Sequence, residues 1–189
     1  MRYAKNHKDE TRQKLVDSSR AIAKKGGFKA TGVDALMASI GLTGGAFYSH
    51  FPSKQALFEE IVAQEMDNSY AMLAGDGEVA DNHVAKCLRN YLSSFHAMNP
   101  EVGCVLPTLG AEIAQAGPEV RSTVEAALKR TQKSWSTRTG DPDAGWALIA
   151  QCVGALVLAR AVESERTRKD ILASSRRFLD VALPTLNKT

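Results

Sequence analysis

Residues 31–57 (TGVDALMASIGLTGGAFYSHFPSKQAL) most constrain the fold of this chain, because they specify two short helices joined by a tight turn. Thr31 is a favourable N-cap, and apolar residues follow at helical spacing until Gly41, a residue suited to a helix C-terminus. Thr43 can cap a second helix. Pro52 ends that helix, because the residue before a proline avoids the helical region. A third helix is expected to follow, with an apolar face made by Leu57, Phe58, Ile61, Val62 and Met66.

The second short helix begins with small residues and ends with hydrogen-bond donors. Small residues allow a close approach to a base pair or a phosphate, and an exposed helix N-terminus attracts phosphate oxygens. A helix-turn-helix places its second helix in the major groove of DNA in this way. We therefore expect small side chains toward the groove and tyrosine, histidine and lysine on phosphate. The expected DNA-binding residues are Thr31, Thr43, Gly44, Gly45, Ala46, Tyr48, His50 and Lys54.

A purely structural interpretation of the same stretch stays open at this point. Phe47 falls on an apolar helical face and is expected in the core, and the two glycines before it could mark a flexible loop. A tyrosine or a histidine at a helix end is usually exposed to solvent or bonded locally. The spacing alone does not separate the two interpretations.

The basic residues are concentrated in the N-terminal part of the chain. Residues 1–60 hold ten Lys and Arg against six Asp and Glu, a net charge of +4, whereas the other 129 residues hold fourteen against fifteen, a net charge of −1. A basic excess around the helix pair is expected for a nucleic-acid interface. The alternative is a solvated helix face, which is what most runs of charge are.

Several classes of site have no support in the sequence. Three scattered cysteines without CxxC spacing predict neither a disulfide framework nor a zinc site. No metalloprotease or nucleotide-binding motif is present, and the hydrophilic N-terminus is not a secretory signal. We expect no metal, no cofactor, no enzymatic activity and a cytoplasmic location. A small all-α enzyme is the competing class, but it needs convergent titratable groups that the sequence does not offer.

Beyond residue 53 the chain is expected to be helical throughout, with turns at glycine and proline. The expected helices span 53–73, a segment ending at Asn99-Pro100 with Phe95 on its buried face, 105–115, and 118–140. No repeat, low-complexity tract or β-alternation interrupts this pattern.

Two helices are expected at the end of the chain, at about 144–162 and 166–186, the first apolar on nearly all sides and the second apolar on one side. Between residues 144 and 159 only Gln151 is strongly polar, and a helix that is apolar on all sides is expected to be buried. It is too short and too closely flanked by charges for a membrane span. The final helix carries Phe178 on its apolar side. Such a surplus of apolar faces predicts a homodimer through these two helices, although an intramolecular core would show similar periodicity.

The helix-turn-helix segment resembles the TetR family of bacterial transcriptional regulators, which typically follow T-S-V-x-D-I-A-x-x-A-G-V-S-K-G-x-L-Y-x-H-F-x-S-K-x-x-L. The resemblance covers roughly the first third of the chain. The chain departs from the pattern at Gly32, where serine is common, and at Gly44, where many members carry lysine or arginine. The matching residues are Thr31, Val33, Leu36, Gly41, Leu42, Thr43, Gly45, Phe47, Tyr48, His50, Phe51, Ser53, Lys54 and Leu57, preceded by Thr11, Arg12, Leu15, Asp17, Ile22, Gly27 and Phe28.

The resemblance implies an all-α protein of about nine helices. A three-helix helix-turn-helix domain would occupy residues 1–52, and a helical effector-binding and dimerisation domain would occupy residues 53–189. It implies a homodimer that pairs through two C-terminal helices per subunit and binds a palindromic double-stranded DNA operator. It also implies a repressor that a small effector releases by favouring a conformation unable to bind DNA. A DNA-binding regulator without an effector is the main alternative.

The sequence indicates an apolar or aromatic effector, with a pocket in the C-terminal region. Each candidate pocket residue could equally be plain core. The candidates are Met66, Tyr70, Tyr91, Phe95, Met98, Cys104, Leu109, Ile113 and Trp135.

Cys104 carries a separate hypothesis. It lies in an expected turn after Gly103, close to the start of a short helix, where a thiolate can be stabilised. A regulator that responds to electrophiles or oxidants through this thiol is therefore another alternative. The opposing interpretation is an inert small core residue.

Overall fold

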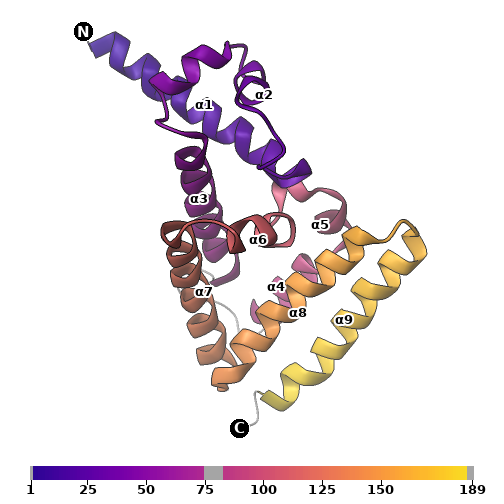
Figure 1. Cartoon of the computed structure of the whole chain (residues 1–189). Coiled ribbons are helices and arrows are strands. Elements are labelled where there is room, and N and C mark those ends of the chain that lie inside the picture. The colour runs from indigo at the N-terminus through magenta and orange to yellow at the C-terminus, as the bar shows by residue number, and fades with distance from the viewer. Residues whose placement is uncertain (1, 75–82, 187–189) are drawn as a thin grey trace.

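The computed structural model describes residues 2–74 and 83–186, and in these ranges the chain is all-α with no strand (Figure 1). This confirms the predicted fold class. Nine α-helices and two short 3-10 helices make up the described chain. They are α1 (Arg2–Gly26), α2 (Val33–Ala38), η1 (Gly44–Ser49), α3 (Lys54–Ala74), α4 (His83–Tyr91), α5 (Ser94–Met98), η2 (Pro100–Val102), α6 (Leu106–Ala114), α7 (Pro118–Thr139), α8 (Pro142–Ala161) and α9 (Glu165–Leu186).

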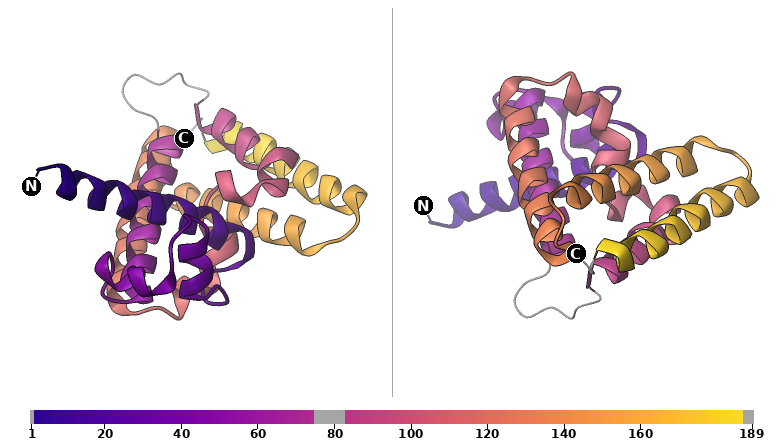
Figure 2. Two further views of the ribbon diagram at one scale, coloured as in Figure 1. Left: turned by 90° about the horizontal axis from the view of Figure 1, so that it is seen from above. Right: turned by 90° about the horizontal axis from the view of Figure 1, so that it is seen from below.

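The N-terminal helices pack around the beginning of α3, and α1 projects beyond the body at its N-terminal end (Figure 2). Gly27 and Gly41 end α1 and α2 with φ of 87° and 75°, a left-handed conformation that glycine adopts without strain. The buried cluster formed here also takes side chains from α6 and α7, so it crosses residue 52, the proposed domain boundary. Its members include Leu15, Val16, Leu36, Met37, Phe47, Phe51, Leu57, Ile61, Val105, Leu109, Ile113, Val120 and Val124.

The caps of the helix-turn-helix differ in part from the expectation. Thr31 does not cap α2: its hydroxyl donates to the Gly27 carbonyl at 3.0 Å, and Gly32 occupies the N-cap position. Thr43 is the N-cap residue of η1 but makes no side-chain capping bond, and η1 is a 3-10 helix. At the start of α3, the Ser53 hydroxyl accepts from the Ala56 N–H at 3.0 Å and caps the helix.

The C-terminal body is built on α7, which packs against both α3 and α8, while α8 packs against α9. The Trp135 indole N–H donates to the Leu73 carbonyl at 3.0 Å, and Arg138 donates to the Ala74 carbonyl at 3.1 Å. These bonds satisfy carbonyls at the C-terminal end of α3, which otherwise have no partner within the helix. They join two helices whose contacting residues are more than 60 positions apart in the chain.

The segment before Asn99 breaks into two helices, where a single helix was expected. Ser93 starts the second one, since its hydroxyl accepts from the His96 N–H at 3.1 Å and caps α5. The break rotates the residues that follow it. Phe95, which was expected on the buried face, is 67% exposed as a result.

The helices α8 and α9 lie side by side at one edge of the molecule (Figure 2). The expectation that α8 is buried on all sides is wrong for a single chain, because Trp146, Val157 and Leu158 are exposed. On α9, Phe178 is 65% and Val181 is 74% exposed in the single chain, so this apolar side is not covered by the chain itself. Among the described helices, α8 is long and apolar enough to cross a membrane by length and composition, a test that core helices also pass.

A buried ion pair fixes α1 against the rest of the molecule. Lys24 of α1 donates to Glu65 of α3 at 2.6 Å, and each side chain is only 4% exposed. The same ammonium donates to the Gly103 carbonyl at 2.9 Å, and Arg20 lies 3.4 Å from the other oxygen of Glu65. The pair therefore joins α1, α3 and the segment after η2 at a single point.

Breaking this pair from one side leaves a buried carboxylate without its main partner, which typically costs about 3–5 kcal/mol. We expect Lys24→Met to lower the free energy of unfolding by about that amount in urea titrations. Lys25→Met, at the exposed neighbouring position, is the matched control and should change it by less than about 0.5 kcal/mol. The double variant Lys24→Met/Glu65→Met should recover most of the loss. Equal stabilities of the two single variants would refute this assignment.

Candidate functional site

The helix η1 lies on the surface and is anchored through one side chain. Phe47 is fully buried, and its ring meets the Tyr48 ring edge-on at 5.3 Å between centroids. Tyr48 itself is 67% exposed, and Thr43 and Gly45 are exposed as well. This combination of a buried anchor and small exposed residues presents η1 outward, as a helix that enters a DNA groove requires.

The two glycines of η1 have different surroundings. A Cβ at Gly44 would lie 1.8 Å from an Asp34 carboxylate oxygen, so the absence of a side chain allows α2 and η1 to approach closely. A Cβ at Gly45 would meet nothing within 4 Å, so this side of η1 faces open space. The close approach to Asp34 gives a packing reason for Gly44, the position at which the chain departs from the pattern it resembles.

His50 ends η1 and is partly buried. Its Nδ1 has no hydrogen-bond partner among the described residues. Burial lowers the pKa of His50, and the positive charges of Lys8 and Arg12 lower it further. The imidazole is therefore neutral at neutral pH and lies close to the basic N-terminal part of α1.

Lys54 and Thr31 are less free than the sequence indicated. Lys54 is partly buried, and its ammonium donates to the Lys29 carbonyl at 3.0 Å and lies 4.8 Å from the Phe28 ring centroid. Burial lowers the pKa of Lys54, while the Glu112 carboxylate acts in the opposite direction. Thr31 is bonded back to Gly27. Both side chains therefore stabilise the segment between α1 and α2 by hydrogen bonds to its carbonyls. A phosphate contact by Lys54 would use the ammonium hydrogens that are not bonded to Lys29.

Part of the basic excess is used inside the protein. Arg12 binds the Glu60 carboxylate and lies 4.3 Å above the Phe51 ring, and Arg20 and Lys24 both pair with Glu65. The charge count alone could not show this, because the acidic partners lie more than 40 positions away in the sequence. Lys8 lies on the exposed N-terminal part of α1, near His50. It is therefore better placed to contact a phosphate than Arg12, Arg20 and Lys24, which pair with carboxylates inside the protein.

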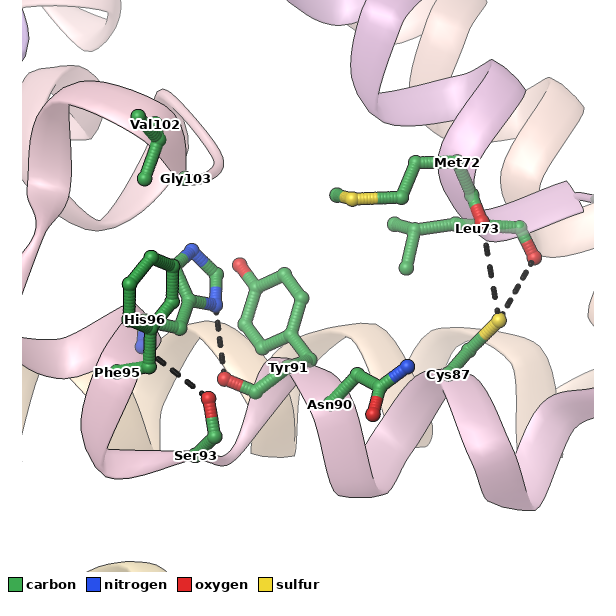
Figure 3. A pocket seen from close by; sticks show the side chains of 10 residues that line it. All are labelled: Met72, Leu73, Cys87, Asn90, Tyr91, Ser93, Phe95, His96, Val102 and Gly103. Atoms are coloured by element: carbon green, nitrogen blue, oxygen red, sulfur yellow. Dashed lines mark hydrogen bonds between the residues drawn. The ribbon is translucent and has the colours of Figure 1, made fainter.

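A cavity of about 170 Å³ lies between the end of α3, α4, α5 and η2 (Figure 3). Of the expected pocket residues, only Tyr91 and Phe95 line it. A hollow of about 20 Å³ nearby is lined by Met66, Tyr91, Cys104 and Trp135, together with other side chains. The lining of the larger cavity is Met72, Leu73, Cys87, Asn90, Tyr91, Ser93, Phe95, His96, Val102 and Gly103.

The remaining pocket candidates lie elsewhere. Leu109 and Ile113 belong to the buried N-terminal cluster on α6, which packs against α1, and they line neither hollow. Tyr70 lies against the Arg130 guanidinium, 4.7 Å from its ring centroid, and Met98 is exposed. Periodicity placed these residues on apolar faces but did not show which face encloses a space.

His96 holds the wall of the larger cavity and was not among the candidate residues of the sequence analysis. Its Nδ1 donates to the Tyr91 carbonyl at 2.8 Å, and its Nε2 accepts from the Cys104 N–H at 2.9 Å. This pattern requires the neutral imidazole. Burial lowers the pKa of His96, the bond to Tyr91 opposes this, and Arg160 and Lys24 lower the pKa further. A Cβ at Gly103 would lie 2.1 Å from the His96 ring, so only glycine fits there.

The Cys104 side chain is buried in the second hydrophobic cluster, and all three cysteines are free thiols. Its neighbours in the cluster include Tyr91, Trp135 and Cys152. An oxidant or electrophile would reach the Cys104 sulfur only after these side chains move. The sensor hypothesis therefore stays a prediction, and the environment is the one expected of an inert core cysteine.

Comparisons with known proteins agree with this geometry. Residues 15–61 match the family described as bacterial regulatory proteins, tetR family. The HTH-type transcriptional regulator UidR of Escherichia coli (strain K12) is 31% identical over 61 residues, 32% of this chain and 31% of UidR. The HTH-type transcriptional repressor DhaR of Mycobacterium sp. (strain GP1) is 22% identical over 111 residues, 59% of this chain and 56% of DhaR. The matched segment therefore spans about a third of UidR and just over half of DhaR.

Solved structures extend the similarity of fold to most of the chain. A TetR transcriptional regulator from Chloroflexus aurantiacus J-10-fl has a TM-score of 0.72 at 21% identity, over 93% of this chain and 96% of that one. A TetR-family regulator from Agrobacterium tumefaciens has a TM-score of 0.75 at 17% identity, over 90% and 97%. Salmonella enterica GusR has a TM-score of 0.65 at 18% identity, over 93% and 96%. At these identities the likeness concerns the fold alone.

The exposure of Tyr48 generates a prediction about nucleic acid. Tyr48→Phe, which removes one hydroxyl donor, should weaken binding to DNA fragments of unrelated sequence by a similar factor, about three- to tenfold, because a phosphate contact carries no base information. Fluorescence anisotropy measures these affinities. Tyr70→Phe, on α3, is the control and should leave them unchanged. A loss confined to one DNA sequence would contradict a phosphate contact.

The surroundings of His50 predict a pH dependence. A phosphate beside the imidazole would raise its pKa above the lowered value of the free protein, so the complex would take up a proton. Affinity for DNA should then increase as the pH falls from about 7.5 to 6, the range in which histidine titrates. His50→Gln should remove this increase, and His83→Gln, on α4, should retain it. A slope that survives in His50→Gln would place the titrating group elsewhere.

Proposed function

We propose that this chain, whose residues 15–61 match the family described as bacterial regulatory proteins, tetR family, is a DNA-binding transcriptional regulator. The observation that carries the proposal is the outward presentation of η1, with Phe47 buried beneath it and Tyr48, Thr43 and Gly45 exposed. Its expected DNA contacts are the exposed residues of η1, with His50 and Lys8 beside the backbone. A regulator of this kind acts on DNA in the bacterial cytoplasm.

The exposed apolar side chains of α8 and α9 support a homodimer. Leu158, Phe178 and Val181 leave apolar surface in water, and an association that covers it is favourable because apolar surface is removed from water. We infer that the same faces of a second copy cover them, in a two-fold arrangement that makes a bundle of four helices. Two η1 helices would then face one side of the DNA, so the operator should be close to a palindrome, with half-sites about one helical turn or a multiple of it apart.

We further propose that the regulator is a repressor released by a small effector. DhaR, one of the relatives, is described as a repressor. The cavity beside α3, α4 and α5 is the largely apolar kind of space that small molecules occupy, and its wall is bonded to α1 through Gly103 and Lys24. An effector that prefers a different setting of α1 shifts the population toward the form that cannot bind the operator.

Selection of bound fragments from random double-stranded DNA tests the regulator and the dimer together. We expect an enriched site with two-fold symmetry. Phe178→Glu/Val181→Glu, which puts two charges into the apolar face of α9, should shift the protein to monomers by analytical ultracentrifugation and lose most of the affinity for the full site. Glu163→Gln, an exposed change outside that face, is the control. Absence of any enriched sequence would contradict the proposed function.

A further inference from the structure

We propose that Asp34 determines part of the DNA sequence that this chain recognises, by accepting a hydrogen bond from the amino group of a cytosine in the major groove. This inference rests on the proposed function, because it takes η1 to be the helix that enters the groove. It deepens that function by naming one side chain and the base that it selects.

Asp34 is the only charged residue between Lys29 and His50, the stretch that contains α2 and η1. The basic residues among the first 60 lie outside this stretch, on α1, at Lys29 and at Lys54. A surface that binds DNA attracts phosphate oxygens through positive charge, and a carboxylate on that surface is repelled by them. A negative charge at this place therefore lowers the affinity for DNA in general, unless the carboxylate meets a hydrogen-bond donor.

Asp34 is exposed and lies beside the first residue of η1. It occupies the second position of α2, and a Cβ at Gly44 would clash with its Oδ1 atom. The carboxylate thus fills the space that a side chain at the start of η1 would take. In a helix-turn-helix the N-terminal residues of the second helix contact the edges of bases. The Asp34 carboxylate is therefore held at the end of η1 that would approach the bases.

The Asp34 carboxylate is available to accept from a base, because no hydrogen bond or ion pair engages it among the residues that the structure describes. Other polar groups nearby are already used. The Ser39 hydroxyl donates to the Leu36 carbonyl at 2.6 Å. The Ser49 hydroxyl donates to the Ala46 carbonyl at 2.7 Å. The polar side chains of residues 32–49 that remain for DNA are Asp34, Thr43 and Tyr48.

Cytosine is the base that best suits a carboxylate in the major groove. An ionised carboxylate only accepts hydrogen bonds, and the donors in this groove are the amino groups of cytosine and adenine. The adenine amino group lies between two acceptors, N7 of the same base and O4 of the paired thymine, and both repel a carboxylate. The cytosine amino group has an acceptor on one side only, O6 of the paired guanine. Asp34 should therefore favour cytosine over the other three bases.

The test measures specific and non-specific binding of the full-length protein in parallel. Selection from random double-stranded DNA gives the preferred site. Fluorescence anisotropy then gives the affinity for this site, for its single-base variants and for an unrelated duplex. The wild type should prefer cytosine by about tenfold at one position of the site, and Asp34→Asn and Asp34→Ala should lose this preference. Both variants should bind the unrelated duplex about two- to fivefold more tightly, because they remove a negative charge from the interface.

These opposite changes separate the reading of a base from a structural role. An acidic residue in the first turn of a helix also stabilises that helix. If Asp34 acted only in this way, its replacement would weaken binding to every DNA sequence by a similar factor. Glu119→Gln is the matched control, because it removes an exposed carboxylate from the second position of α7. It should change neither the base preference nor the affinity for the unrelated duplex.

Two results would overturn the role of Asp34 and leave the proposed function intact. One is a selected site at which the wild type and both variants show the same base preferences at every position. The other is a loss of affinity in the variants that is equal for all sequences. A preference that depends on Asp34 but favours another base would overturn the assignment to cytosine. A wild type that enriches no sequence would instead overturn the regulator function, and the role of Asp34 with it.

Discussion

The position of the N-terminal helices depends on one buried contact, the Lys24 ammonium between the Glu65 carboxylate and the Gly103 carbonyl. Two charges removed from water need close and well-oriented partners, so this pair tolerates only a narrow range of settings for α1 against α3. The third partner, Gly103, belongs to the segment that His96 holds through the adjacent N–H of Cys104. The angle of α1, and with it the presentation of η1, is thereby tied to a segment that also forms the wall of the cavity.

Much of the fold could be predicted because helix ends in this chain are signalled locally. Gly41, Ser53 and Pro118 each act within a few residues of the helix end that they define, and the structure places ends at these positions. The break between α4 and α5 was missed because apolar spacing continues across it. The only local signal was Ser93, a residue as common in loops as at caps.

In the candidate sites, too, features set by neighbouring residues could be predicted, and features set by residues distant in the sequence could not. The exposure of Tyr48 and the burial of Phe47 follow from spacing along one short helix. The tethering of Lys54 to Lys29, the pairing of Arg12 with Glu60 and the cavity around Tyr91 depend on residues brought together only by packing. Periodicity in a single sequence does not reveal contacts between distant residues. The count of basic residues therefore overstated the number of unpaired positive charges, and the pocket candidates included core residues.

The 3-10 geometry of η1 limits how many side chains it can offer to a groove. With about three residues per turn, Gly44 and Phe47 share one row and Gly45 and Tyr48 share the next. The first row faces Asp34 and the core, whereas the second opens to solvent. A longer side chain at position 45 would extend this outer row without disturbing α2, whereas one at position 44 would require Asp34 to turn away. A change in the outward surface of η1, by evolution or by engineering, is therefore easiest at a single glycine.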